Sequence, residues 1–234
     1  SVSVMPCTAK KHELGRDDQG TDGYQDVDYS LTTRELAKMI RMAGIEFMKL
    51  EDEPYDNPLG EYTGAGVIFG ATGGVMEAAL RTAVEKLTGE ELIDLDFVDV
   101  RGIKGVKEAE YDLQGKKVKV AVASGLANAR IIMDKVKAGE ADYTFIEIMG
   151  CPGGCVNGGG QPHVDSQVRN FIDVRAERAK GLYTLDKNAP IRKAHENPVI
   201  VKMYDDYLGV PGGEKAHHLL HTSYVNRGVN KQAD

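Results

Sequence analysis

The sequence predicts an α/β protein with a largely parallel sheet covered by helices, followed by a helical C-terminal segment that wraps around it. Short runs rich in β-branched residues alternate with amphipathic stretches, and from about residue 165 the expected strands stop. Alternating strands and helices are typical of a parallel sheet with helices on its faces. We therefore expect an α/β domain at residues 1–164 and a helical region at residues 165–234.

The expected strands are short and apolar. They cover residues 1–5, 66–70, 97–100, 117–124 and 144–149. Runs of this length, rich in valine, isoleucine and phenylalanine, are typical of strands that a sheet buries. The first and the last of them each end just before a cysteine, so we expect the sheet to place these cysteines.

Three helices are expected between these strands. They cover residues 32–44, 74–87 and 127–139, and the first two align apolar residues on one face,. A threonine N-cap begins the first helix, and Gly139 ends the third,. All three are expected to cover the sheet.

The composition argues against a membrane-spanning or nucleic-acid-binding protein. Of 234 residues, 41% are hydrophobic and 28% are charged, and no apolar run reaches the roughly 18 residues that a membrane span needs. The 29 basic and 36 acidic side chains give a net charge of −7, whereas nucleic-acid binding requires a basic face. Three cysteines are too few for a secreted disulfide scaffold, which favours a reduced compartment or a bound metal.

The N-terminus starts inside an expected strand, without a methionine and without the regions of a signal peptide,. A natural domain seldom starts in the middle of an element. We therefore expect a fragment, a processed chain or one half of a split protein.

The stretch EIMGCPGGCVNGGGQP places Cys151 and Cys155 on one loop after an apolar strand. Cysteine thiolates are soft ligands for zinc, copper(I) or iron-sulfur clusters. The glycines that follow, Gly158, Gly159 and Gly160, allow the main chain to approach a bulky anionic group without a Cβ in between,. The loop therefore predicts a bound group larger than a single zinc ion.

The stretch MPCTAKKHE carries the third cysteine, Cys7, again directly after a strand, with Lys10 three residues later. If the two cysteine-bearing strands lie close together, the three sulfurs converge on one pocket, where Lys10 can donate to an anionic ligand. Spacing alone leaves simpler interpretations open. A zinc ion could bind the cysteines with His12 or His163, the thiols could be buried and inert, and Lys10 could be solvated.

Together, MPCTAKKHE and EIMGCPGGCVNGGGQP resemble two of the three signature motifs of the iron-only ([FeFe]) hydrogenases, MPCxxKxxE and ExMxCxxGCxxGGGxP. The run GAGVIFGATGGVMEAALR resembles a further characteristic run of that family, and the C-terminal stretch from RKAHENPV to HTSY resembles its small-subunit region. The resemblance covers nearly all 234 residues. It implies an incomplete C-terminal half of the catalytic domain at residues 1–164 and a small-subunit-like region at residues 165–234.

The resemblance also implies roles for individual residues. Cys7 and Cys151 match ligands of the [4Fe-4S] cubane of the H-cluster. Cys155 matches the thiolate that also bridges to the two-iron subcluster, which carries CO, CN and dithiolate ligands. Lys10 matches a lysine that donates to a cyanide, and Glu13 resembles the acid that orients it. The implied surroundings of the cluster are Met5, Pro6, Phe69, Gly70, Met149, Gly158 and Gly159.

The implied reaction is reversible proton reduction, 2H⁺ + 2e⁻ to H₂, with electrons from a ferredoxin-like carrier or an accessory iron-sulfur domain. The family's first motif, TSCCPxW, is absent from the sequence, and with it the fourth cubane cysteine and the cysteine that donates protons. We therefore expect the chain to be inactive alone and to need an N-terminal half or a second chain that carries this motif. Oxygen-sensitive chemistry and the lack of a signal favour a cytoplasmic location, with a periplasmic one if targeting lies in the absent portion.

Two alternative functions stay open. The chain could be a non-catalytic, hydrogenase-like iron-sulfur protein that acts in cluster assembly or binding, or a zinc-binding module. The retention of Met5, Lys10 and Met149 argues against the first alternative, because a plain cubane binder has no cyanide to hold.

Two other motifs favour structural roles. GATGG at residues 70–74 lacks the spacing of a phosphate-binding loop and predicts close packing,. His217 and His221 are four residues apart without an HExxH motif, so we expect buried, hydrogen-bonded histidines there rather than a metal site,.

Overall fold

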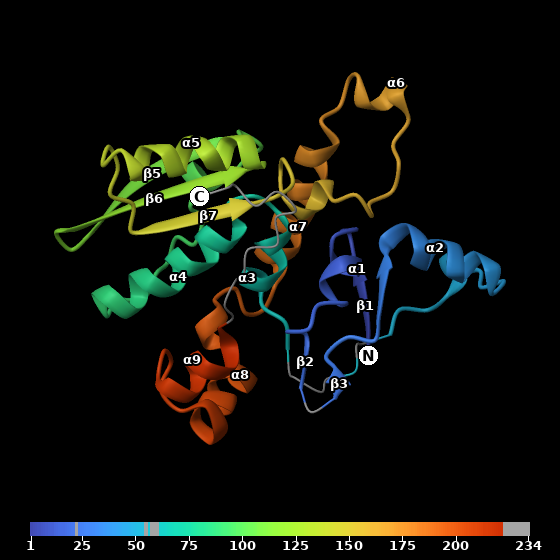
Figure 1. Cartoon of the computed structure of the whole chain (residues 1–234), viewed down its shortest axis with the longest axis horizontal. Helices are drawn as coiled ribbons and strands as arrows, with labels where there is room; N and C mark the ends of the chain where they lie inside the picture. The colour runs from blue at the N-terminus through green and yellow to red at the C-terminus, as the bar shows by residue number, and fades with distance from the viewer. Residues whose placement is uncertain (22, 54–55, 57–60, 222–234) are drawn as a thin grey trace, which may run out of the picture.

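The computed structural model describes residues 1–21, 23–53, 56 and 61–221, which form three small sheets with helices around them (Figure 1). This arrangement confirms the expected α/β class. Two of the strand pairs are parallel and two are antiparallel. The sequence did not predict the antiparallel pairs.

The three-stranded sheet forms the core of the molecule. Its strands are β5 (Val106–Leu113), β6 (Lys116–Ser124) and β7 (Phe145–Met149), in the order β5-β6-β7. A tight turn joins β5 to the antiparallel β6, whereas α5 (Leu126–Lys137) connects β6 to the parallel β7. Parallel neighbours need such a crossover connection.

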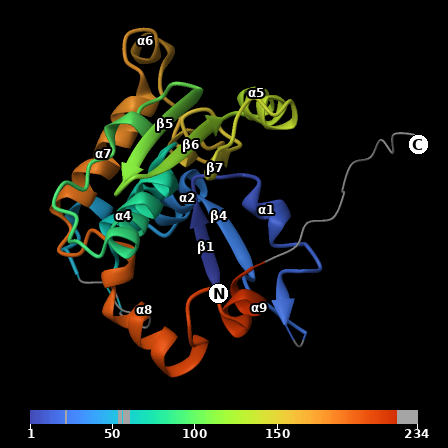
Figure 2. The same cartoon turned by 90° about the vertical axis from the view of Figure 1, so that its left-hand side faces the viewer.

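Helices cover both faces of this sheet, α5 on one and α4 (Gly74–Thr88) on the other (Figures 1 and 2). The α4 side is a cluster of larger apolar side chains, Met76, Leu80, Val100, Leu113, Val118, Val120 and Val122. The α5 side is built from smaller ones, Ala121, Ala123, Ala129 and Ile132. The central strand β6 is therefore buried on both faces, whereas β5 exposes Glu108, Glu110 and Asp112 at the edge of the sheet,.

A smaller parallel pair, β1 (Val2–Met5) and β4 (Tyr29–Thr32), lies apart from this sheet. The short helix α1 (Lys10–Glu13) and the hairpin of β2 (Gly20–Thr21) and β3 (Tyr24–Gln25) connect the two strands. Helix α2 (Thr33–Met42) follows, then the 3₁₀ turn η1 (Phe47–Lys49).

The expected threonine cap of the first long helix is confirmed. Thr32 accepts a hydrogen bond from the Glu35 amide, and the Glu35 carboxylate accepts one from the Thr32 amide. This reciprocal capping box satisfies two amide groups that would otherwise lack partners at the helix start.

Two expected strands are wrong. Residues 66–70 lie in α3 (Gly64–Val67) and the 3₁₀ turn η2 (Ile68–Gly70), and residues 97–100 contain the 3₁₀ turn η3 (Val98–Val100). A short apolar run is equally consistent with a buried strand and with a buried helical turn, because it is too short to show a period. The Thr63 side chain caps α3 by accepting a hydrogen bond from the Gly66 amide, which favours the helical turn,.

All described elements after residue 165 are helical, as expected. They are α6 (Ser166–Arg169), α7 (Val174–Asn188), η5 (Ala194–Glu196), α8 (Pro198–Met203), η6 (Tyr204–Leu208) and α9 (Glu214–Leu220). Helix α7 packs against α3. The boundary between residues 164 and 165 stays a prediction, and the expected helical region extends beyond residue 221, outside the described residues.

No helix among the described residues is both long and apolar enough to cross a bilayer.

A buried ionic network joins α4 to α7. Arg81 is fully buried, and its guanidinium donates to Glu77 on α4 at 2.7 Å and to Asp186 on α7 at 2.7 and 2.8 Å. Arg101 and Arg192 extend the network by donating to Glu77 and Asp186 respectively. The helical region is thus tied to the α/β part by charges in its interior.

A second contact between α4 and the helical region should make the free energy of unfolding depend on pH. Burial opposes ionisation of Glu85, but hydrogen bonds from Lys193, from the Leu92 amide and from His195 outweigh it and lower the pKa of Glu85 to about 2. The unfolded carboxyl titrates near 4.5, so this stabilisation is complete above pH 4.5 and is lost as the pH falls towards 2.

We expect Glu85→Gln to be less stable than the wild type at pH 7, with a difference that shrinks between pH 4.5 and 2,. Urea unfolding across this pH range measures the effect. The exposed Glu90→Gln is the control and should follow the wild type at every pH. A difference for Glu85→Gln that is constant with pH would contradict the prediction.

Candidate functional site

The two cysteine-bearing segments come together although their strands belong to different sheets. The Gly160 amide donates to the Pro6 carbonyl at 2.8 Å, and the Arg34 amide donates to the Gly160 carbonyl at 3.3 Å. A Cβ on Gly158 would lie 2.1 Å from the Pro6 carbonyl oxygen. The glycine run at residues 158–160 therefore packs against the main chain beside Cys7.

The loop from Cys151 to Cys155 is fixed by backbone contacts. The Gly154 amide donates to the Cys151 carbonyl at 2.9 Å, and the Thr72 amide donates to the Gly153 carbonyl at 3.1 Å. Gly154 has a φ of 97°, and a Cβ there would lie 2.7 Å from the Thr72 nitrogen. Glycine is needed at this position for both reasons.

The three thiols and one ammonium share an electrostatic environment. Cys7, Cys151 and Cys155 are free and half-buried. Burial raises the pKa of the Cys155 thiol, the charges of Cys7 and Cys151 raise it further, and the Lys10 ammonium lowers it. A cation close to the Cys155 sulfur, such as the Lys10 ammonium, therefore favours its thiolate form,.

Among the described residues, the three cysteine sulfurs do not lie close enough to one another to share a single metal ion. Two thiolates on one tetrahedral zinc lie about 3.8 Å apart, given a Zn–S bond of about 2.3 Å. In the part of the chain that the structure describes, no group of three metal-ligating atoms within 4.8 Å of one another includes a cysteine, or includes His12 or His163. A cubane offers each thiolate its own iron and so accepts more widely spaced ligands.

Five of the residues singled out by the motifs lie within a few residues of a cysteine in the chain. Lys10 donates to Glu13 at 2.5 Å within α1, the helix that directly follows Cys7. Met5 and Met149 are the last residues of β1 and β7, and both are half-buried. Pro6, also half-buried, lies between Met5 and Cys7 in the chain.

The remaining motif residues touch this loop or lie beside it. The Gly70 carbonyl oxygen lies 2.8 Å from the position of a Cβ on Gly154. Phe69 precedes it in η2, and its side chain is 46% exposed. A Cβ on Gly159 would lie 3.0 Å from the Thr8 hydroxyl. Gly70 and Gly159 therefore pack against the cysteine-bearing segments through their backbones.

Two arginines that the sequence analysis did not single out hold the loop after Cys155. Arg34 on α2 donates to the Gln161 carbonyl at 2.5 Å, and Arg178 on α7 donates to the carbonyls of Val156 and Pro162 at 3.0 and 2.8 Å. Side-chain bonds to distant main-chain carbonyls leave no local pattern in the sequence. The loop is thus fixed from both sides by helices.

Other candidate sites carry structural roles or none. Close packing of GATGG is confirmed, since a Cβ on Gly73 or Gly74 would lie within 2 Å of a carbonyl oxygen, at 1.8 and 1.7 Å. The expectation of buried histidines at 217 and 221 is wrong. His217 and His221 are exposed on one face at the end of α9, with ring centroids 4.2 Å apart.

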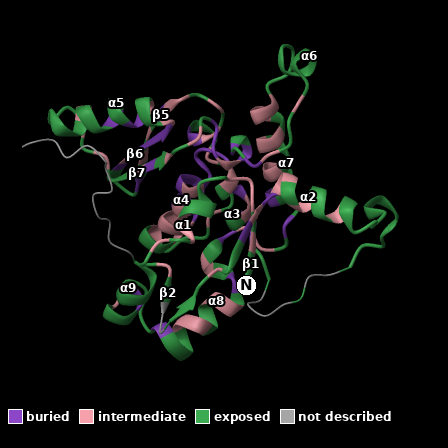
Figure 3. Ribbon diagram, turned by 45° about the vertical axis from the view of Figure 1, so that its right-hand side comes forward, coloured by how far each residue is buried: buried purple, intermediate pink, exposed green. Residues whose placement is uncertain are grey.

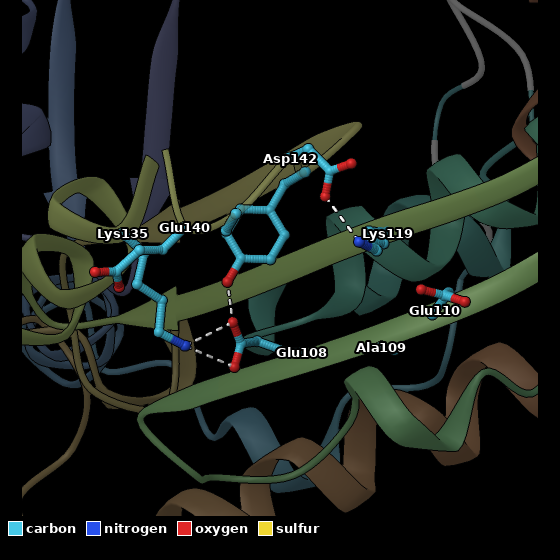
Figure 4. Close-up of a pocket in the computed structure, with 9 residues that line it drawn as sticks. Glu108, Ala109, Glu110, Lys119, Lys135, Glu140 and Asp142 are labelled. Atoms are coloured by element: carbon cyan, nitrogen blue, oxygen red, sulfur yellow. Dashed lines mark hydrogen bonds and ion pairs between the residues drawn. The ribbon is translucent and has the colours of Figure 1, made fainter. Parts of the chain in front are cut away.

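A polar pocket of about 410 Å³ lies on the three-stranded sheet beside α5 (Figure 4). Four of its charged groups pair with one another, because Lys135 donates to Glu108 at 3.0 Å and Lys119 donates to Asp142 at 2.8 Å. The Tyr143 hydroxyl also donates to Glu108. None of the motif residues lines this pocket.

Comparisons with known proteins match both parts of the chain. The family profile described as "Iron only hydrogenase large subunit, C-terminal domain" matches residues 1–159, and that described as "Iron hydrogenase small subunit" matches residues 172–227. Iron hydrogenase 1 of Clostridium pasteurianum is 50% identical over 224 residues, 96% of this chain and 39% of the relative. Cytosolic iron-sulfur assembly component 3 of Rattus norvegicus is 32% identical over 241 residues, 98% of this chain and 49% of the relative.

A solved structure of a hydrogenase also matches the chain. A variant of the [FeFe]-hydrogenase HydA1 from Chlamydomonas reinhardtii superimposes with a TM-score of 0.76 at 42% identity, over 96% of this chain and 62% of that chain. The chain thus spans less than two thirds of the structure it matches and about half or less of the two relatives.

Proposed function

Because the chain belongs to the iron-only hydrogenase family, we propose that it forms part of a site for reversible proton reduction, 2H⁺ + 2e⁻ to H₂. One observation carries this proposal. The segments that carry Cys7 and Cys155 contact each other through the hydrogen bond from the Gly160 amide to the Pro6 carbonyl at 2.8 Å, although they come from opposite ends of the α/β part. Soft thiolate ligands and a nearby cation suit an anionic iron-sulfur cofactor, and this chain offers three such thiolates and Lys10,.

In this proposal the cofactor is the H-cluster, a [4Fe-4S] cubane linked to a diiron subcluster with CO, CN and dithiolate ligands. Cys7, Cys151 and Cys155 would hold the cofactor through their thiolates, with Cys155 as the ligand nearest to the subcluster. When bound, this group supplies the electron transfer and the proton chemistry. The chain has three cysteines, so the fourth cubane ligand comes from elsewhere.

The chain's own residues would bind the cofactor and line its site. Lys10 would donate to a cyanide, and Glu13 holds the Lys10 ammonium in place, as their 2.5 Å contact supports. A charge-assisted bond of this kind strengthens where water is excluded. The apolar lining comes from Met5, Pro6, Met149 and Phe69, while the backbones of Gly70, Gly158 and Gly159 allow close approach.

Exposed apolar surface supports a partner that completes the site. β1 and β4 form a parallel pair alone, with Val2 59% and Val4 43% exposed, and two strands are seldom stable by themselves. Helix α2 has no buried residue (Figure 3). We propose that an N-terminal half, or a second chain with the TSCCP motif, covers this surface, and that a ferredoxin-like carrier or accessory iron-sulfur domain supplies electrons. The cytoplasmic location stays a prediction.

The test is to produce the chain alone and together with a polypeptide that carries the first cysteine motif, both with the maturation machinery. We expect infrared bands of bound CO and CN and hydrogen evolution only when both polypeptides are present. Co-purification without infrared bands would contradict the proposed cofactor. Equal activity of the chain alone would contradict the need for a partner.

We expect Lys10→Ala to lose the diiron subcluster while the fold is retained, because the cation that faces the cyanide is removed. The measurement is the intensity of the CO and CN bands per cubane, with circular dichroism to monitor the fold. Lys11→Ala is the matched control. It removes the neighbouring lysine, which pairs with Glu35 on α2 instead. Normal maturation and turnover of Lys10→Ala would rule out this role.

A second candidate function is iron-sulfur cluster assembly without catalysis. It is favoured by the match to cytosolic iron-sulfur assembly component 3, which spans 98% of this chain. A protein of that kind would bind a cubane but show no CO or CN bands. A zinc-binding module is the third candidate, and metal analysis showing zinc without a brown chromophore would support it.

A further inference from the structure

Two buried charged residues, Lys107 and Glu147, reach one turn of the chain from opposite sides. Lys107 on β5 is aligned with Val122 on β6, and Val122 is aligned with Glu147 on β7. The three residues therefore lie in a row across the sheet, on the face that α4 covers,. Lys107 is 6% exposed and Glu147 is 5% exposed. Burying two charges in one apolar layer is costly unless both are well bonded.

Both charged groups bond to the turn that precedes α4. The Glu147 carboxylate accepts from the Gly73 amide through one oxygen and from the Met76 amide through the other, each at 2.7 Å. The Lys107 ammonium donates to the Thr72 carbonyl at 2.9 Å and to the Gly102 carbonyl at 3.0 Å. Glu147 thus binds amides at the start of α4, where negative charge is favourable. Lys107 binds the Thr72 carbonyl just before this helix.

The same turn supports the cysteine loop. The Thr72 amide donates to the Gly153 carbonyl at 3.1 Å, and the Thr72 nitrogen and the Gly70 carbonyl oxygen lie 2.7 and 2.8 Å from a Cβ position on Gly154. The peptide groups on both sides of Thr72 are therefore engaged, one by the cysteine loop and the other by Lys107.

We propose that Lys107 and Glu147 are positioning residues that fix the turn at residues 71–74 and, through it, the loop that carries Cys151 and Cys155. The side chains of Lys107 and Glu147 hydrogen-bond to residues 72, 73, 76 and 102, and to none of the described residues from 151 to 155. Their effect on a cluster rests on the proposed function, whereas their effect on the loop does not.

The electrostatics agree with this geometry. Burial lowers the pKa of Lys107 to about 8, and the charge of Glu147 raises it in part. The charge of Glu147 across the sheet thus offsets part of the cost of burying the Lys107 ammonium, whose hydrogen bonds go to the carbonyls of Thr72 and Gly102.

The experiment uses the full chain and the variants Glu147→Gln and Lys107→Met. Leu113→Ala is the control, because Leu113 belongs to the same core cluster at the far end of β5. The first measurement is amide hydrogen exchange in the cluster-free chain. For Glu147→Gln we expect exchange to accelerate by about tenfold at Gly73 and Met76, which lose a bond to a charged acceptor, and also at Thr72 and Gly154.

Lys107→Met leaves the bonds to Glu147 possible, so Thr72 and Gly154 should respond more than Met76. This variant decides the question if Glu147→Gln does not fold. Leu113→Ala should lower global stability without singling out these four amides. If neither positioning variant changes exchange at Thr72 and Gly154, or if Leu113→Ala reproduces the same pattern, the proposal is wrong.

The second measurement concerns the cluster, in the chain assembled with the polypeptide that carries the first cysteine motif. We expect Glu147→Gln to shift the g values of the reduced cluster in electron paramagnetic resonance, while Leu113→Ala lowers yield without shifting them. A wild type that takes up no iron would contradict the proposed function and leave the exchange result intact. Unshifted g values in a loaded Glu147→Gln protein would contradict positioning of the cluster.

Discussion

Arg81→Met is expected to destabilise the chain by about 3 to 5 kcal/mol, because it removes the fully buried cation that bridges two buried carboxylates and leaves each with only the partly exposed arginine at its edge,. Glu77 is fully buried and Asp186 is 1% exposed, so water cannot replace the guanidinium. Hydrogen bonds from Arg81 lower the pKa of Asp186 against the opposing effect of burial. Urea unfolding of the full chain at pH 7 measures the loss.

Arg130→Met is the matched control. Arg130 lies on α5 in a similar arrangement, four residues before Asp134, but the two side chains are 82% and 67% exposed. Exposed pairs contribute about 0 to 1 kcal/mol. Similar losses for the two variants would show that burial of the network is not what makes Arg81 important.

Gly158→Ala is expected to separate the two cysteine segments. The added Cβ would lie 2.1 Å from the Pro6 carbonyl oxygen, and because that atom belongs to the backbone, the segment beside Cys7 must move. Overpacking of this kind costs about 1 to 3 kcal/mol. We expect a larger functional effect, since a displaced Cys7 can no longer share a cluster with Cys155. Iron content per chain after assembly with its partner measures it.

Gly150→Ala is the matched control for Gly158→Ala. It tests whether the effect comes from the contact at residue 158 or from losing any glycine of the loop. Gly150 lies in the same loop, and a Cβ there would meet no atom within 4 Å. Its stability should stay within about 0.5 kcal/mol of the wild type, with normal iron content. If Gly158→Ala also retains its iron, the contact with Pro6 is not needed to bring the cysteines together.

The sequence predicted well those elements whose pattern is local. The strand at 117–124 and the helices around 32–44, 74–87 and 127–139 are long or strongly periodic, and all are found. The run at 66–70 is too short for its period to decide, and its packing against α7 decides instead,.

Strand β5 was missed for a physical reason. Its buried or half-buried positions include Lys107, Ala109, Tyr111 and Leu113, which alternate with exposed acids. With a lysine pointing inwards, the alternation of apolar and polar residues is hidden in the sequence. Only the carbonyls that Lys107 meets, from distant segments, explain why it is buried.

The residues of the candidate site also fall into two groups, those that the sequence singles out and those that it does not. The cysteines, the lysine and the glycine run stand in the motifs MPCTAKKHE and EIMGCPGGCVNGGGQP, so the sequence singles out these residues. Thr72, Arg34 and Arg178 act through backbone bonds across long sequence separations. Such contacts leave no periodic or local signal, and only the folded chain brings them together.

The ionic network between α4 and α7 limits how freely parts of this family can be exchanged. Arg81 lies within the stretch matched by the large-subunit profile, and Asp186 within that matched by the small-subunit profile. A chimera that takes its C-terminal region from another homologue must preserve both charges or replace them jointly. Joint replacement of Arg81 and Asp186 should therefore be tolerated better than replacement of either residue alone.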